Sequence, residues 1–136
     1  MEAGVLTPIR QTVASSGKQT TDQQEEAAKV MVNLALVDDM DDVFVRSDIV
    51  RPLLAVLSNG NSAQLRTLAC MALENMAVQS PAVRDHIGST GGVQAAVQLL
   101  NTSDQPLAAR GASLLGRLAL SNNNRKAFVS SAENQR

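Results

Sequence analysis

A ten-residue segment that recurs three times at a fixed spacing constrains this chain most. Residues 26–35 read EAAKVMVNLA, residues 68–77 read LACMALENMA, and residues 110–119 read RGASLLGRLA, so each copy begins 42 residues after the previous one. Self-similarity at a period of roughly 40 residues is typical of stacked helical repeats. The spacing therefore predicts three tandem repeats in one chain.

The aligned columns of the three copies agree in chemical kind. The second column is small in every copy, the sixth and ninth are large and apolar, and the tenth is always alanine. Apolar residues at 27, 28, 31, 34 and 35 follow the period of an amphipathic helix. We therefore expect each segment to be one long helix whose small residues allow close packing.

The composition fits such helices. Apolar residues make up 44% of the 136 residues but aromatic residues only 1%, so the core must be built from Ala, Leu, Val and Met. The length predicts a single domain over residues 1–136. We predict an all-α fold.

The net charge of −1 gives no reason to expect a nucleic acid or an anionic membrane as partner. The charge is uneven along the chain: residues 1–45 have a net charge of −5 and residues 46–136 one of +4. Two interpretations remain open, namely a head-to-tail stack of copies and local variation between solvated faces.

The sequence predicts a soluble intracellular protein, in the cytoplasm or the nucleus. The single cysteine, Cys70, excludes an internal disulfide framework. The N-terminus lacks the basic and apolar regions of a signal peptide. No apolar run approaches the roughly 18 residues of a membrane span.

Turn and capping signals divide the chain into repeats of a short, a medium and a long helix. We expect a capping box at the start of the first long helix, completed by Gln24 and Glu25, and capping of the next helix by residues 38–42. The predicted repeats are residues 3–47, 48–90 and 91–129, followed by a frayed tail over residues 130–136. The predicted helices cover residues 3–13, 21–37, 43–46, 49–58, 63–78, 81–88, 93–100, 105–120 and 122–129, and residues 14–21 are a predicted loop.

Several segments together resemble the armadillo repeat. They are GGVQAAVQLL at residues 91–100, AARGASLLGRLA at 108–119, NNRKAFV at 123–129, and Asn33-Leu34-Ala35, which is similar to that family's recurrent Asn-Leu-Ala. The resemblance covers nearly the whole chain. It implies a right-handed α-solenoid whose third helices line a concave groove that holds an extended peptide of a partner protein.

The resemblance also implies which residues line this groove, over positions 24–33, 66–75 and 108–117. One position of each long helix, which we call the ladder position, faces the groove in this family. It is occupied here by Asn33, Asn75 and Arg117, and one helical turn earlier lie Lys29, Met71 and Ser113. An asparagine amide carries donors and an acceptor, so a row of them can bind a peptide backbone. The alternative is that Asn33 and Asn75 satisfy local or inter-repeat hydrogen bonds. Importin-α-like members carry Trp at the earlier position, and its absence here argues against binding of nuclear localisation signals.

Nothing in the sequence indicates catalysis, a cofactor or a metal site. Asp38, Asp39, Asp41 and Asp42 lack the Gly and Glu of a calcium loop and suit either helix capping or a rim that attracts a basic partner. His86 has no second ligand at a metal spacing, and we expect it on the surface. Cys70 replaces an alanine of the repeat and is predicted to be buried. Gly111 and Gly116 are predicted to mark close helix contacts.

The ends of the array leave two hypotheses open. We expect Val5, Leu6, Ile9 and Val13 to be exposed in the first repeat, and Leu114, Leu118 and Val129 in the last. The sequence favours a protein-interaction scaffold that binds an extended peptide. The alternative is an assembly module, either a segment of a longer array or a chain that forms homo-oligomers through these ends.

Overall fold

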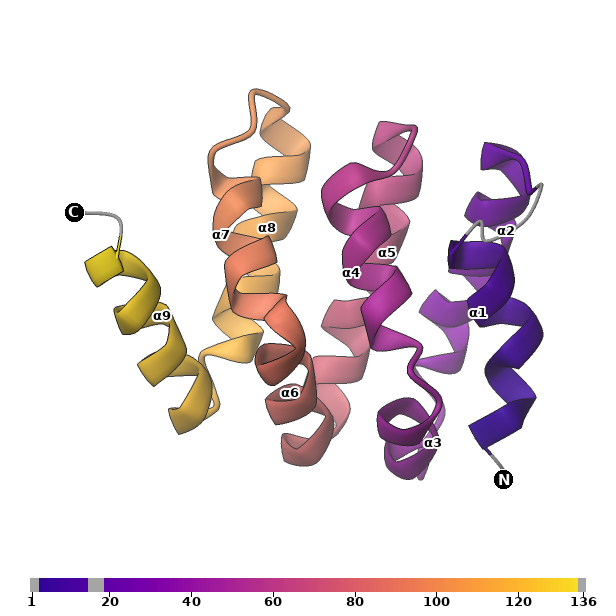
Figure 1. Cartoon of the computed structure of the whole chain (residues 1–136), viewed down its shortest axis with the longest axis horizontal. Helices are drawn as coiled ribbons and strands as arrows, with labels where there is room; N and C mark the ends of the chain where they lie inside the picture. The colour runs from indigo at the N-terminus through magenta and orange to yellow at the C-terminus, as the bar shows by residue number, and fades with distance from the viewer. Residues whose placement is uncertain (1–2, 15–18, 135–136) are drawn as a thin grey trace.

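The computed structural model describes residues 3–14 and 19–134, and within these ranges all regular structure is helical. Figure 1 shows an elongated stack that runs from the N-terminus at one end to the C-terminus at the other. This arrangement confirms the predicted all-α solenoid of three-helix repeats.

The helices form two layers and a lower edge in the view of Figure 1. The layer nearer the viewer contains α1 (Thr7–Ala14), α4 (Val50–Asn59) and α7 (Val93–Leu100), and behind it lie α2 (Thr21–Leu34), α5 (Ala63–Gln79) and α8 (Gln105–Leu118). The lower edge contains α3 (Asp41–Arg46) and α6 (Pro81–Ile87), and α9 (Asn122–Asn134) lies at the C-terminal end. A 3-10 turn, η1 (Ala3–Leu6), precedes α1, and η2 (Gly88–Gly92) connects α6 to α7.

The third helix of each repeat organises the stack. α5 packs against α2 on one side and α8 on the other, while α1, α4 and α7 cover the backs of α2, α5 and α8. Each repeat thus buries its apolar face on its neighbours, as expected for a solenoid.

Side-chain caps set where the long helices begin. Thr20 Oγ1 accepts from the Gln23 amide at 3.1 Å, and Gln23 Oε1 accepts from the Thr20 amide at 2.8 Å. The predicted capping box on Gln24 and Glu25 is therefore wrong, because Thr20, with extended backbone angles, is the N-cap. Gln24 is instead buried and donates to the Val13 carbonyl at 2.9 Å.

Several other helix ends differ from the prediction. α2 ends at Leu34 and α8 at Leu118, because the following turns switch to bonds between residues three apart. No aspartate side chain caps α3, whose N-cap is Met40. α9 extends to Asn134, so residues 130–134 of the predicted frayed tail are helical. Residues 15–18 of the predicted loop and residues 135–136 lie outside the described residues.

Small residues let the helices approach closely. Ala28, Ala69 and Ala77 are fully buried in the long helices. A Cβ atom on Gly111 would lie 2.5 Å from Leu99 Cβ, so α8 contacts α7 at a distance that only glycine permits. Gly116 differs from the prediction, since nothing lies within 4 Å of its Cβ position.

The terminal residues are more buried than the sequence predicted. Leu6 and Val13 are 1% and 0% exposed. Leu6 belongs to η1, which contacts α1 and α3, and Val13 belongs to α1, which packs on both α2 and α4. Leu114 and Leu118 are also fully buried, and their helix α8 packs on both α5 and α7. Val5 and Val129 are exposed as expected.

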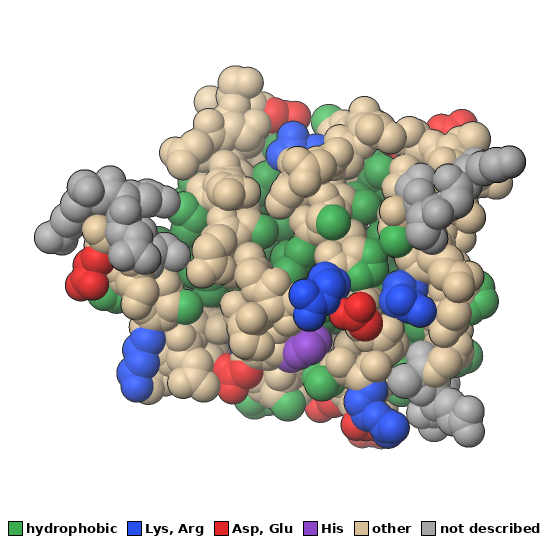
Figure 2. Space-filling view, in the orientation of Figure 1, with side chains coloured by type: hydrophobic (Ala, Val, Ile, Leu, Met, Phe, Trp, Pro, Cys, Tyr) green, Lys and Arg blue, Asp and Glu red, His purple; other side chains and the backbone are tan. Residues whose placement is uncertain are grey.

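Figure 2 shows the face formed by α1, α4 and α7. Its charged side chains gather toward the lower part, next to the histidine, and both signs are mixed there. The visible centre carries mostly uncharged and apolar side chains. No patch of one charge sign dominates this face.

Candidate functional site

Six of the side chains singled out in the sequence lie on the third helices. Lys29 and Asn33 lie on α2, Met71 and Asn75 on α5, and Ser113 and Arg117 on α8. The members of each pair are four residues apart and so share one face of their helix. Because α5 packs between α2 and α8, the pairs form two rows across the stack. We call this surface the ladder face.

Asn75 already makes an inter-repeat hydrogen bond. Its Nδ2 donates to the Val32 carbonyl of α2 at 3.0 Å. Val32 needs this donor, because the Leu36 amide bonds to the Asn33 carbonyl at 3.1 Å and not to that of Val32. For Asn75, the alternative interpretation is therefore correct: one N–H group of its side-chain amide makes a hydrogen bond between repeats.

The other ladder residues have different surroundings. Asn33 and Arg117 are exposed, and Met71 and Ser113 are half-buried. Lys29 Nζ lies 3.0 Å from Glu26 Oε1, and the hydrogen bond to Glu26 raises the pKa of Lys29. Lys29 is therefore a cation that is paired within its own helix, whereas no ion pair of Arg117 is found in the part of the chain that the structure describes.

A third row, three positions after the ladder residues, was missed by the sequence reasoning. Val78 lies on α5, and Leu36 and Leu120 lie in the turns that follow α2 and α8. Leu36, Val78 and Leu120 are 58%, 52% and 64% exposed. They are again 42 residues apart, and each follows its ladder residue by three positions. Three exposed aliphatic side chains in repeat register form an apolar row beside the polar one. The 42-residue spacing could have revealed this row, but apolar residues next to a helix pattern are usually interpreted as core.

The seam between α5 and α8 contains a second inter-repeat polar contact. Glu74 is buried, and its Oε2 accepts from Arg110 Nη1 at 3.1 Å. Burial of Cys70 beside this pair raises the pKa of its thiol to about 12. The cysteine is fully buried as predicted, and a thiol with this pKa is no nucleophile at neutral pH.

Two features of the described residues bear on metal binding and on membrane insertion. Among the residues that the structure describes, no three His, Cys, Asp or Glu side chains are grouped so as to hold a metal ion. None of the described helices is both long and apolar enough to cross a membrane.

Comparison with known proteins supports the fold. No family model matches the sequence, and no curated protein does either. Among solved structures, a designed armadillo repeat protein superposes with a TM-score of 0.81 at 15% identity, over 93% of this chain and 52% of that one. Two engineered proteins superpose with TM-scores of 0.79 and 0.77 at 23% and 22% identity, over 96% and 92% of this chain and 33% and 51% of theirs.

These similarities show an armadillo-like repeat fold, as the sequence resemblance implied. The chain spans about half or less of the length of the structures that it matches. All three are described as designed or engineered proteins, and none as an enzyme.

Proposed function

We propose that this chain is a non-catalytic interaction module that binds an extended segment of a partner protein along the ladder face. The observation that carries the proposal is the repeat register of two adjacent rows. The polar row is Asn33, Asn75 and Arg117, and the apolar row is Leu36, Val78 and Leu120. Exposed apolar side chains that are aligned in this way favour a binding surface over scattered exposure.

The distance between neighbouring repeats indicates which peptide sequence would fit the ladder face. Neighbouring packed helices lie about 8–10 Å apart. A peptide in the extended polyproline II conformation advances about 3.1 Å per residue with three residues per turn, so every third side chain lies on the same face. One repeat therefore matches about three peptide residues. A partner with an apolar side chain at every third position would place one against each of Leu36, Val78 and Leu120, while Asn33 and Arg117 are exposed to meet its backbone.

We also place this function inside the cell, in the cytoplasm or nucleus. The only cysteine is a free, buried thiol, which suits a reducing compartment.

Two labelled 12-residue peptides of identical composition test the proposal. One carries Leu at every third position among Ser and Thr, and the other has the same residues scrambled. Fluorescence anisotropy should show tighter binding of the periodic peptide. The apolar row is about half exposed, so each contact should contribute about 1 kcal/mol.

The matched variants are the triple substitution Leu36→Ser, Val78→Ser and Leu120→Ser, and the control Val5→Ser. All four positions are exposed, so both variants should keep the far-ultraviolet circular dichroism of the parent chain. The triple variant should lose about 3 kcal/mol, or roughly 100-fold in affinity, and the control should lose nothing. Equal binding of the scrambled peptide, or an unchanged affinity in the triple variant, would refute the proposal.

A further inference from the structure

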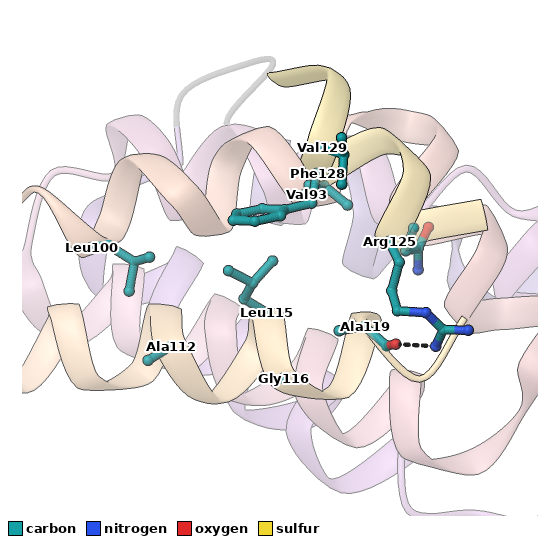
Figure 3. Close-up of a pocket in the computed structure, with 10 residues that line it drawn as sticks. Val93, Leu100, Ala112, Leu115, Gly116, Ala119, Arg125, Phe128 and Val129 are labelled. Carbon is teal, nitrogen blue, oxygen red and sulfur yellow. Dashed lines mark hydrogen bonds between the residues drawn. The ribbon is translucent and has the colours of Figure 1, made fainter. Parts of the chain in front are cut away.

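An apolar cavity opens at the C-terminal end of the stack. It has a volume of about 460 Å³ and lies between α7, α8 and α9. Figure 3 shows Phe128 of α9 projecting over Leu115 of α8, and Arg125 donating to the Ala119 carbonyl at 2.7 Å. Apolar groups dominate its wall, which is lined by Val93, Leu100, Ala112, Leu115, Gly116 and Phe128, among others.

The repeat register shows what kind of surface this is. One repeat earlier, the equivalents of Leu100, Leu115 and Phe128 are Leu57, Leu73 and Ile87, and all three are 0% exposed. They are covered where α7 and α8 pack on α4 and α5. In the last repeat, Leu100 and Phe128 are 42% and 41% exposed. The cavity wall therefore continues the interface between repeats, and its shape fits another pair of medium and long helices.

The opposite end of the same chain presents such a pair. The outer face of α1 and α2 is open, with a cavity of about 530 Å³ bordered by Thr12, Asp22, Glu26, Ala27 and Val30, among others. Val30 is 44% exposed, whereas its equivalents Ala72 and Leu114 are both 0% exposed in the inner repeats. This face is thus also an uncovered interface between repeats. It is the side that would pack against the α7–α8 end of a preceding repeat.

The Gly116 carbonyl at the C-terminal end has no partner among the described residues, whereas its equivalent, the Val32 carbonyl, accepts from Asn75. The Leu120 amide bonds to the Arg117 carbonyl at 3.2 Å and not to that of Gly116, which is the geometry that frees the Val32 carbonyl for Asn75. The residue equivalent to Asn75 in an incoming α2 is Asn33, which is exposed. An incoming Asn33 would therefore be placed to donate to the Gly116 carbonyl.

The charges at the two ends are complementary. The α2 end exposes Asp22, Glu26 and Lys29, with Lys29 paired to Glu26, and so has a net negative charge. The α9 end exposes Arg125, Lys126 and Glu133 and has a net positive charge. Opposite charges at two surfaces favour their encounter and set its direction. Docking of two identical ends would instead bring charges of the same sign together.

We propose that a second copy of this chain docks head to tail, with the α1–α2 end of one copy on the α7–α8–α9 end of the other. Asn33 of the incoming copy bonds to the Gly116 carbonyl, and Val30 faces the apolar cavity. This contact is heterologous, so it extends into a ladder of masses and does not close as a symmetric dimer. It shares Asn33 with the peptide face proposed above, but not the apolar row of Leu36, Val78 and Leu120.

Gly116→Arg is the decisive variant. No atom lies within 4 Å of the Cβ position of Gly116, so the substitution fits the single chain and fills the docking surface. The control is Gln98→Arg, which adds the same charge to an exposed position of α7 outside the cavity. Its equivalent Ala55 stays exposed in the inner repeat. Thermal unfolding at low concentration verifies that both variants fold.

Multi-angle light scattering on the 136-residue chain across a concentration series is the test. The mass of the parent chain and of Gln98→Arg should rise with concentration, and Gly116→Arg should stay monomeric. Glu26→Lys should weaken the association at least several-fold, and added salt should weaken the association of the parent chain. The triple serine variant of the apolar row should associate like the parent chain.

Three outcomes overturn the inference. A monomeric parent chain up to millimolar concentration would mean that the cavity has a different occupant, such as a repeat of another protein or a small apolar ligand. Unchanged association of Gly116→Arg would place the contact elsewhere. Loss of association in the triple serine variant alone would assign it to the ladder face.

Discussion

The two glycines of α8 should respond in opposite ways to the same substitution. Replacing a glycine by alanine inside a helix gains about 0.8–1 kcal/mol, because alanine loses less backbone entropy on folding. At Gly116 nothing lies within 4 Å of the new Cβ. Gly116→Ala should therefore raise the free energy of unfolding by about 1 kcal/mol.

At Gly111 the same methyl group meets the neighbouring helix. Its Cβ would lie 2.5 Å from Leu99 Cβ and 3.1 Å from the Ala96 carbonyl oxygen. Neither atom is the end of a flexible side chain, so α7 and α8 must move apart. Overpacking of this kind costs about 1–3 kcal/mol. After the propensity gain, Gly111→Ala should lower the free energy of unfolding by about 1 kcal/mol.

Urea denaturation followed by circular dichroism, at concentrations where the chain is monomeric, measures both variants against the parent. The two should differ by about 2 kcal/mol, with Gly116→Ala the more stable. A Gly111→Ala variant as stable as Gly116→Ala would refute the reasoning, because it would mean that α7 and α8 are not in close contact at this glycine.

Two further predictions follow from the contacts of single side chains. Asn75→Ala should lower the free energy of unfolding by about 1 kcal/mol, because the Val32 carbonyl loses its donor. Asn33→Ala should change the free energy of unfolding by less than about 0.5 kcal/mol. Equal effects of the two substitutions in chemical denaturation would contradict this difference. Cys70, whose thiol pKa is raised to about 12 by burial, should not react with a thiol reagent at pH 8 until the chain unfolds. Rapid labelling of the folded chain would contradict the burial. The thiol pKa is higher in the folded than in the unfolded chain, so the buried thiol contributes fully to the free energy of unfolding below about pH 9. This contribution is lost as the pH rises toward 12.

The sequence predicted most helices because their apolar residues recur at the helical period. The interiors of α5, α7 and α8 lie where the pattern placed them, and the small residue at Gly111 is indeed a close contact. Helix ends were less predictable. Thr20 and Thr21 are equally good caps in the sequence, and only the backbone angles of Thr20 select it.

The candidate site was predictable in position but not in role. The repeat register placed Asn33, Asn75 and Arg117 on equivalent helix faces. It left open whether the asparagines bind a partner or a neighbouring repeat, and the structure gives Asn75 the second role. The apolar row of Leu36, Val78 and Leu120 was missed, because a sequence pattern does not reveal that no helix covers those positions.

The sequence by itself determined the repeat length, the helical fold and the small residues at the packed seams. These depend on local periodicity and on side-chain size, which are properties of neighbouring residues in the chain. Only the tertiary structure decided that Leu6, Val13, Leu114 and Leu118 are buried and that Gly116 is open. Exposure depends on which helix packs against a face, and stacking brings together residues about 42 positions apart, whose contacts local sequence patterns do not encode.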